Sequence, residues 1–322
     1  MITWVNSAKG IGIILVIFGH LLYSSNLQGL NQIIYAFHIP LFFILSGYVQ
    51  KCCDIRNHVL QKIHRLLIPF LCHALLWVFI FGFDYNKQSN LILSFLLDCF
   101  YITGEISNNP LWFLMVLFEV HILCLLLNLQ SKNSLFQVLL CFVFFSLGFI
   151  AYSFSSFVVL NFWGFNRTIV CFSFFVIGLL YRRVELQENN IVFAITAMLF
   201  ITFGIGLNTK VSIYGFNFGN NYFSFLMAAV TGSITVIQFC KRYLNTQNYF
   251  ADLSQYAILF LGTQYYWILP FRAQMDKIGL SFSWYYNVVM LLCVVLYVRI
   301  LPVLYERIKI LFPFLKYLNG DI

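Results

Sequence analysis

The chain has 322 residues, of which 61% are hydrophobic and only 9% are charged, and its formal net charge is +8. Because soluble domains carry about 25% charged residues, this composition excludes a soluble globular protein and indicates a polytopic helical membrane protein. Most of the nine cysteines lie singly within apolar segments, and Cys52 and Cys53 are directly adjacent. Their spacing therefore indicates neither a metal site nor a redox motif.

Apolar stretches of about 18–20 residues, the length that crosses a bilayer, recur from one end of the chain to the other. We predict an all-α integral membrane bundle of about ten transmembrane helices, forming a single domain over residues 1–322. The predicted spans are residues 8–24, 31–49, 66–83, 111–129, 135–152, 157–180, 191–207, 222–239, 256–270 and 283–304. A shorter apolar segment at 91–102 is predicted to be interfacial or re-entrant.

The basic residues predict an orientation for this bundle, because cytoplasmic loops carry an excess of Lys and Arg. A cytoplasmic N-terminus puts thirteen basic residues on the inner side and four on the outer side. The inner residues are Lys9, Lys51, Arg56, Lys62, Arg65, Lys132, Arg182, Arg183, Lys241, Arg242, Arg307, Lys309 and Lys316. The outer residues are Lys87, Lys210, Arg272 and Lys277. We therefore predict that both termini are cytoplasmic. The predicted orientation in the membrane also accounts for the net charge of +8, so no nucleic-acid partner is expected.

Lys9 and His20 lie near opposite ends of the first predicted span. Eleven residues at about 100° each return the two side chains to nearly the same helix face, about 16 Å apart along the axis. They can therefore line one groove, with a cation at its cytoplasmic mouth and an imidazole deeper in. The pattern is equally typical of a positive-inside anchor and a histidine that packs against a neighbouring helix. This segment by itself leaves both interpretations open.

Ionisable side chains inside a bilayer are costly and usually functional, and the predicted spans hold few of them. They are His20, His38, Glu119, His121 and Arg167. A rise of about 1.5 Å per residue places His38 and Glu119 roughly 12 Å, and Arg167 roughly 15 Å, from the outer ends of their spans. We expect these groups to share a hydrated cavity. Glu119 could orient a histidine or form an ion pair with Arg167, and the sequence leaves both roles open.

Two further residues lie at predicted span ends. Arg65 enters the third span from the cytoplasm within HRLLIPF, where a guanidinium group suits bidentate phosphate recognition. In isolation, Arg65 is better explained as a positive-inside anchor. Trp112, within NNPLWFL, is predicted at the outer interface, where tryptophan is common.

Taken in order, these segments resemble the membrane acyltransferase family 3, especially its branch of fucose 4-O-acetylase-like sugar O-acetyltransferases. The resemblance rests on WVNSAKGIGIILVIFGH, FHIPLFFILSGY, HRLLIPF, LWFL and the later QYAILFLGTQY. It covers most of the chain, although the specific motifs lie in its first part. Two positions depart from the family pattern: Asn6 replaces a common acidic residue, and Gln264 follows Thr263 where histidine is frequent. Glutamine forms hydrogen bonds but does not exchange protons.

The resemblance implies transfer of an acetyl group from acetyl-CoA to a hydroxyl of a cell-surface or lipid-linked polysaccharide sugar, without a metal. It implies a multi-pass protein of the bacterial cell (inner) membrane, where the lipid bilayer, acetyl-CoA and the carbohydrate acceptor are its partners. The expected catalytic residues are His20, His38 and Glu119. The expected substrate-binding residues are Lys9, Arg65, Trp112, Arg167 and Gln264, with Lys9 and Arg65 meeting the phosphates of the donor.

Acyl transfer to an alcohol needs a base, and a neutral imidazole suits that task. His20 could take the hydroxyl proton directly or become transiently acylated as a nucleophile, and the sequence leaves both open. The alternative function is a secondary transporter or flippase for a polysaccharide precursor, because buried His, Glu and Arg suit proton-coupled transport. Against it, the sequence has no paired, interrupted segments related by an internal repeat.

Overall fold

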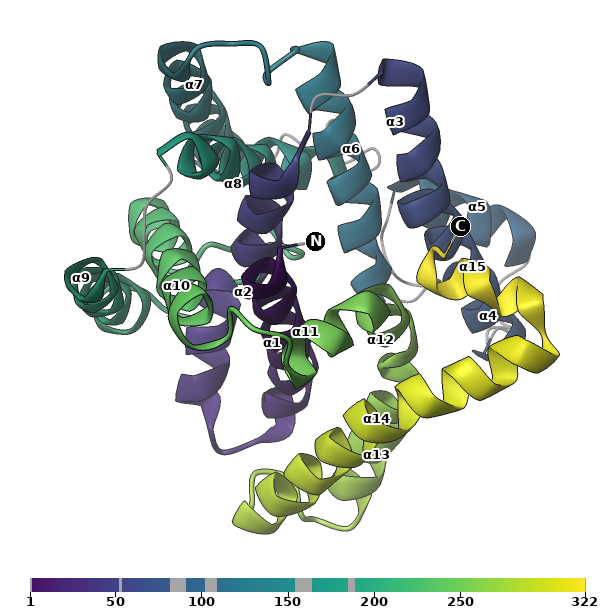
Figure 1. The fold of residues 1–322 in the computed structure, drawn as a ribbon. Coiled ribbons are helices and arrows are strands. Elements are labelled where there is room, and N and C mark those ends of the chain that lie inside the picture. Colours follow the sequence, from purple (N-terminus) through teal and green to yellow (C-terminus); the bar gives the residue numbers. More distant parts are fainter. Residues whose placement is uncertain are drawn as a thin grey trace. The chain divides into compact units, whose positions relative to one another are not determined.

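A computed structural model of the chain describes residues 2–51, 54–81, 91–101, 109–153, 164–184 and 189–321. Every regular element in these ranges is a helix (Figure 1). The contacts divide the chain into two compact units. The first unit consists of Met1–Leu45 and Glu185–Phe312, and the second of Ser46–Val184 and Pro313–Ile322.

Six helical segments of the described residues are long and apolar enough to cross a membrane by length and composition. They are Thr3–Ser24, Gln28–Val49, Ile55–Phe81, Ser134–Ser153, Tyr222–Tyr243 and Trp284–Leu311. Each overlaps a predicted span, although Ile55–Phe81 begins eleven residues before the third predicted span, of which residues 82 and 83 lie outside the described residues. The prediction of an all-helical membrane protein is therefore confirmed. The count of ten spans and the orientation stay predictions.

Three of the other predicted spans are helical but shorter or displaced. Helix α6 (Trp112–Leu126) covers most of the span at 111–129. Helix α9 (Asn190–Ile201) continues into the π-helical turn η7 (Thr202–Gly206) and covers the span at 191–207. Helix α8 (Phe165–Val184) overlaps the span at 157–180, of which residues 157–163 lie outside the described residues.

The predicted span at 256–270 consists of two helices. Helix α12 (Ala257–Thr263) and helix α13 (Tyr265–Lys277) meet at Gln264. The short apolar segment predicted at 91–102 contains helix α5 (Leu91–Tyr101). The outer position predicted for Lys87 lies outside the described residues.

Helix α1 (Thr3–Leu21) is central to the first unit. It contacts helices from the second half of the chain, namely α10 (Tyr222–Tyr243), α11 (Tyr249–Leu253), α12, α13 and α14 (Trp284–Leu311). Helix α9 lies along α10 (Figure 1). Asparagine side chains accept hydrogen bonds from backbone N–H groups at three helix starts, as N-cap residues do: Asn189 at α9, Asn221 at α10 and Asn248 at α11.

The end of α1 that carries His20 is fixed by hydrogen bonds from two other helices. Asn31 of α2 (Gln28–Val49) donates from Nδ2 to the carbonyl oxygen of Gly19, at 2.7 Å. Tyr286 of α14 donates from its hydroxyl to the carbonyl oxygen of Leu21, also at 2.7 Å. Carbonyl groups at a helix end lack partners within the helix, so these contacts satisfy them and hold α2 and α14 beside His20.

In the second unit, α8 contacts α6 and α7 (Ser134–Ser153), and the C-terminal helix α15 (Lys316–Asn319) contacts α4 (Ile68–Phe81). Helices α3 (Ile55–Lys62) and α4 are joined by the π-helical turn η2 (Ile63–Leu67). Such turns are rare and frequently lie at functional sites.

Helices α7 and α14 present apolar side chains outward. Only 17% of the apolar window of α7 and 22% of that of α14 is buried, against 61% for the segment Thr3–Ser24. Helices that face lipid bury few side chains and keep their backbone hydrogen bonds internal, which is the arrangement of these two helices.

Gly10 permits the close packing of α1 on α11. A Cβ atom at Gly10 would overlap the carbonyl oxygen of Phe250, whereas a Cβ atom at Gly29 would have nothing within 4 Å. Overpacking of this kind costs about 1–3 kcal/mol. We therefore expect Gly10→Ala to lower the melting temperature of the detergent-purified protein in a thermal unfolding assay, and Gly29→Ala, the matched control, to leave it unchanged. Equal melting temperatures for both variants would contradict direct backbone contact at Gly10.

Candidate functional site

His20 lies near the end of α1 and is half-buried, with two tyrosine hydroxyls at the same ring nitrogen. The hydroxyl of Tyr265 is 3.0 Å from His20 Nδ1 and that of Tyr35 is 3.3 Å from it. Both rings meet the imidazole edge to face, with centroids 5.0 Å and 6.3 Å away. A tyrosine hydroxyl can accept a hydrogen bond from Nδ1–H, and in that tautomer Nε2 carries a lone pair that can take a proton.

Tyr35 connects His20 to the second predicted histidine, His38. Three residues separate Tyr35 from His38 on α2, so both lie on one side of the helix, and their ring centroids are 5.0 Å apart. His38 is buried and donates from Nδ1 to the carbonyl oxygen of Ile34, at 2.7 Å. This bond fixes the His38 ring and leaves its Nε2 as the nitrogen available to other groups.

The junction of α12 and α13 brings Tyr265 to His20. Gln264, which we predicted as a binding residue, is fully buried at this junction. Its Nε2 donates to the carbonyl oxygen of Leu261, at 3.2 Å, and its Oε1 has no hydrogen-bond partner. The next residue in the same motif, Tyr265, makes the contact with His20.

Lys9 lies on the same unbroken helix as His20, partly exposed. The continuous helical register of α1 gives these residues the nearly common face and the separation of about 16 Å that the sequence predicted. The surroundings of this half of α1 are closely packed: Asn248 Nδ2 donates to Ser7 Oγ at 2.8 Å, and Ser7 Oγ donates to the carbonyl oxygen of Leu244 at 2.9 Å.

Two cations gather near the other end of α1, around Tyr23. The guanidinium group of Arg272 lies 4.7 Å, and the ammonium group of Lys210 4.5 Å, from the centre of the Tyr23 ring. Lys210 also lies 5.7 Å from the centre of the Tyr35 ring. Arg272 Nε donates to Ser24 Oγ at 3.1 Å. Burial, and then the positive charge of Arg272, lower the pKa of the Lys210 ammonium group.

Lys210 is presented by the loop between η7 and α10, and Asn208 organises this loop. The Oδ1 of Asn208 accepts hydrogen bonds from the backbone N–H groups of Thr209 and Asn220, at 2.9 Å and 2.8 Å. Its Nδ2 donates to the carbonyl oxygen of Phe218 at 3.1 Å. One side chain therefore joins both ends of the loop that carries Lys210.

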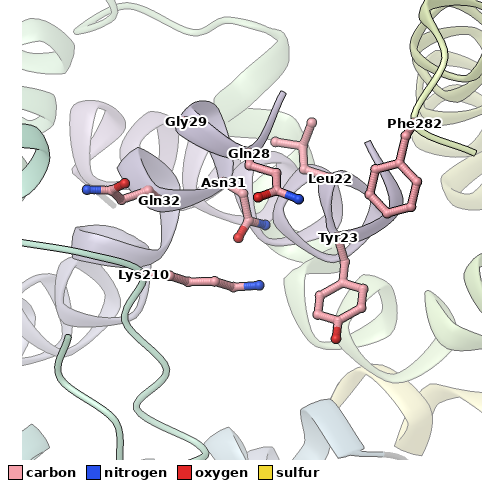
Figure 2. A pocket seen from close by; sticks show the side chains of 8 residues that line it. All are labelled: Leu22, Tyr23, Gln28, Gly29, Asn31, Gln32, Lys210 and Phe282. Carbon is pink, nitrogen blue, oxygen red and sulfur yellow. The ribbon is translucent and has the colours of Figure 1, made fainter. Parts of the chain in front are cut away.

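A pocket of about 400 Å³ lies beside these cations. Figure 2 shows its lining residues, which are Leu22, Tyr23, Gln28, Gly29, Asn31, Gln32, Lys210 and Phe282. Asn31 is 2% exposed, and its Oδ1 has no hydrogen-bond partner. The pocket therefore combines a cation, amide groups and exposed aromatic rings.

The second unit holds the other predicted site residues. Glu119 of α6 accepts a hydrogen bond from the hydroxyl of Thr168. The guanidinium group of Arg167 lies 5.7 Å from the ring centre of Trp112, within cation–π range, and both residues are buried. Arg65 is exposed on the π-helical turn η2.

The predicted site residues are thus divided equally between the two units. Lys9, His20, His38 and Gln264 belong to the first unit. Arg65, Trp112, Glu119 and Arg167 belong to the second. The structure brings His20 and His38 together through Tyr35. The hydrated cavity that was expected to join all the ionisable groups stays a prediction. No cluster of three or more potential metal ligands occurs among the described residues.

Sequence reasoning missed Tyr35, Tyr265, Lys210 and Arg272. For Tyr35 a signal was available, because it precedes His38 by three residues on a predicted helix. Tyr265 ends the motif QYAILFLGTQY, in which only Gln264 was selected. Lys210 and Arg272 were counted for orientation alone, although they are half of the four cations assigned to the outer side.

Comparisons of the sequence with known proteins identify relatives of the chain. The model of a family described as "Acyltransferase domain" matches residues 2–304. The chain is also similar to "Nodulation protein NolL" of Mesorhizobium japonicum, with 37% identity over 78 residues. That match covers 22% of this chain and 21% of the relative, so the chain spans about a fifth of the curated relative it matches. No solved structure gives a significant match.

The hydrogen bonds of Asn208 predict how firmly the loop holds Lys210. Asn208→Ala removes the side chain that joins the two ends of the loop. Each lost hydrogen bond that leaves a buried group unpaired costs about 1–3 kcal/mol, so we expect local opening and an increase of about tenfold or more in tryptic cleavage after Lys210. Asn190→Ala, at an exposed asparagine, is the control. Equal cleavage rates in the two variants would show that Asn208 does not hold the loop.

Proposed function

The chain belongs to the acyltransferase family whose model covers residues 2–304, and we propose that it transfers an acetyl group from acetyl-CoA to a hydroxyl of a cell-surface or lipid-linked carbohydrate. In this proposal it acts in the bacterial inner membrane, with both termini in the cytoplasm. The observation that carries the proposal is the contact of the Tyr265 and Tyr35 hydroxyls with His20 Nδ1. It fixes an imidazole in the orientation that a base or a nucleophile requires.

The proposed reaction uses His20 Nε2. With Nδ1–H donating to a tyrosine oxygen, Nε2 takes the proton of the acceptor hydroxyl as that oxygen attacks the thioester carbonyl carbon. The new carbon–oxygen bond forms and the carbon–sulfur bond breaks. CoA leaves as the thiolate, and the proton held by His20 passes to it. Tyr265 and Tyr35 act as positioning residues, because they touch the imidazole and stabilise its charged form by hydrogen bonding.

The second route passes through an acylated histidine. Here Nε2 attacks the thioester carbonyl carbon, the carbon–sulfur bond breaks, and CoA leaves as the thiolate. The acceptor oxygen then attacks the acetyl carbon, the bond from that carbon to Nε2 breaks, and the hydroxyl proton passes to the CoA thiolate. The two routes differ in one measurable species. Radiolabelled acetyl-CoA without acceptor should label the protein at His20 only in the second route.

The donor is proposed to lie toward Lys9. The 3′-phosphate and pyrophosphate of CoA suit cationic side chains, and we propose that Lys9 and Arg65 bind them. His38 supports the site through Tyr35. Substrate contacts by Trp112, Arg167 and Gln264, and a catalytic role of Glu119, are further parts of the proposal. The buried Oε1 of Gln264, which lacks a partner, supports a role in hydrogen bonding for that residue.

His20→Ala tests the proposed function directly. Full-length protein in nanodiscs is given radiolabelled acetyl-CoA and a carbohydrate extract of the native cell surface, and label on the acceptor is measured. We expect His20→Ala to lower transfer by about 10²–10⁴-fold, the usual contribution of a general acid–base group. His64→Ala, at an exposed histidine, is the control and should retain activity. An unlabelled acceptor together with saccharide flux across vesicles containing the wild-type protein would instead support a transporter.

Tyr265→Phe tests how His20 is positioned. Removal of the hydroxyl keeps the ring that packs on the imidazole but removes the contact with Nδ1. We expect kcat to fall about 10- to 100-fold, with little change in KM for either substrate, and the pH profile of kcat to shift. Tyr285→Phe, at an exposed tyrosine of α14, is the control. A rise in KM at constant kcat would place Tyr265 in substrate binding instead.

A further inference from the structure

Lys210 and Arg272 form a cationic pair that the proposed reaction does not use. Lys210 comes from the loop before α10 and Arg272 from α13, yet both lie over the ring of Tyr23, at 4.5 Å and 4.7 Å from its centre. Because both distances end on the same ring centre, the two cations are separated by no more than the sum of these distances, and the charge of Arg272 acts on Lys210. Like charges at short range repel each other, most strongly where water is partly excluded.

Among the described residues, no salt bridge joins Lys210 or Arg272 to a carboxylate, and Asp276, one helical turn after Arg272, accepts a hydrogen bond from the Ser281 hydroxyl. Within the described residues, the salt bridge that occurs joins Lys309 to Glu306. Arg272 donates to the neutral hydroxyl of Ser24, and Lys210 contacts aromatic rings. Tyrosine rings attract cations through their faces, but they do not neutralise the charge. Two neighbouring cations without a carboxylate are the arrangement expected of a site whose counter-charge is a ligand.

The pocket next to Lys210 is suited to a polyhydroxylated ligand. Figure 2 shows the amide group of Asn31 and the ammonium group of Lys210 directed into the same space. The Oδ1 of Asn31 is a buried acceptor without a partner, and a ligand hydroxyl would satisfy it. The ring of Phe282 is 54% exposed at the pocket, on backbone with a φ of 62° that is rare for a bulky residue. Strained backbone of this kind gathers at ligand sites.

We propose that Lys210 and Arg272 bind an anionic group, a carboxylate or a phosphate, on the acceptor saccharide, whose hydroxyls hydrogen-bond in the adjacent pocket. The acceptor is accordingly an acidic or phosphate-bearing saccharide and not a neutral one. This inference rests on the proposed function, because it names the class of acceptor for the His20 reaction. Arg272 supplies a planar donor group for two oxygens, and Lys210 supplies a compact charge.

The position of the pair connects it to the reaction. Lys210 lies 5.7 Å from the centre of the Tyr35 ring, and the Tyr35 hydroxyl is 3.3 Å from His20 Nδ1. An anionic group held by the pair is therefore separated from His20 by about one side chain. In this proposal, a hydroxyl on the same or the next sugar ring reaches the imidazole.

Direct binding tests this inference without relying on catalysis. Full-length protein in phosphatidylcholine nanodiscs is titrated with fluorescently labelled trigalacturonic acid and with labelled maltotriose, a neutral trisaccharide. We expect trigalacturonic acid to bind at least about tenfold more tightly, since hydrogen bonds to charged groups are stronger than those between neutral groups. Competition by unlabelled glucose 1-phosphate distinguishes a phosphate from a carboxylate as the anionic group of the acceptor. Strong competition by it indicates a phosphate-bearing acceptor, and weak competition indicates a carboxylate.

Variants then assign the effect to the two cations. Arg272→Gln and Lys210→Gln should each reduce the preference for the anionic trisaccharide about tenfold, while Arg272→Lys retains most of it. Lys277→Gln, at an exposed lysine on the same helix as Arg272, should leave it intact. Equal binding of the acidic and neutral trisaccharides would overturn the inference. So would a preference that is abolished by phosphatidylglycerol in the nanodiscs, because the site would then bind lipid headgroups.

The same samples keep this inference distinct from the proposed function. Acetyl transfer to a neutral saccharide, with no anionic preference in binding, would overturn the inference and leave the function standing. Tight binding of the anionic trisaccharide, lost in Arg272→Gln but without acetyl transfer to any acceptor, would leave the site standing and overturn the function.

Discussion

The arrangement around His20 depends on one constraint, the need to satisfy backbone carbonyl groups where α1 ends. A helix end leaves carbonyls without partners in the helix, and in a membrane water is scarce. Other segments therefore supply the donors: Asn31 to Gly19, Tyr286 to Leu21, and the backbone N–H of Phe282 to Ser24 at 3.0 Å. Each of these bonds ties α2, α14 or the segment before α14 to the same few residues. The helix end is thus held by three hydrogen bonds from other segments, and it is also the place where the candidate catalyst lies.

The tyrosine contacts of His20 follow from that constraint. Once Asn31 is bonded to Gly19, Tyr35, one helical turn later on α2, is brought beside the imidazole. Tyr265 is supplied by a different helix, at the start of α13. Precise placement of a base requires rigid supporting groups, and here both supports are aromatic side chains on helices. The same geometry engages Nδ1 with two tyrosine hydroxyls, and we propose that Nε2 is the nitrogen that faces a substrate.

Features of the fold and the site that depend on neighbouring residues were predictable from the sequence, and those that depend on contacts between distant residues were not. The apolar length of α1, α2, α7, α10 and α14 is a local property, and all five were predicted from the sequence. Lys9 and His20 lie on one helix, so their spacing also follows from local geometry. The contact between His20 and Tyr265 joins residues 245 positions apart, and hydropathy does not reveal which distant helix packs beside His20. The position of Lys210 could not be predicted from the sequence either, because it is set by the hydrogen bonds of Asn208.

In the proposed reaction, only uncharged groups, the thioester and the acceptor hydroxyl, meet at His20, and the positions of the cations in the first unit give a reason for this. Moving a charged group into the membrane interior costs several kcal/mol, and we therefore propose that the phosphates of a CoA donor stay at the Lys9 end of α1. By the same reasoning, an anionic group of the acceptor stays with Lys210 and Arg272 near the opposite end. Only the thioester and a hydroxyl, both uncharged, then need to approach His20. Lys9 and His20 are about 16 Å apart, the rise of eleven residues, and the cation pair lies farther on, over Tyr23. In this proposal the length of the helix therefore keeps the two anions apart and favours the encounter of the neutral groups.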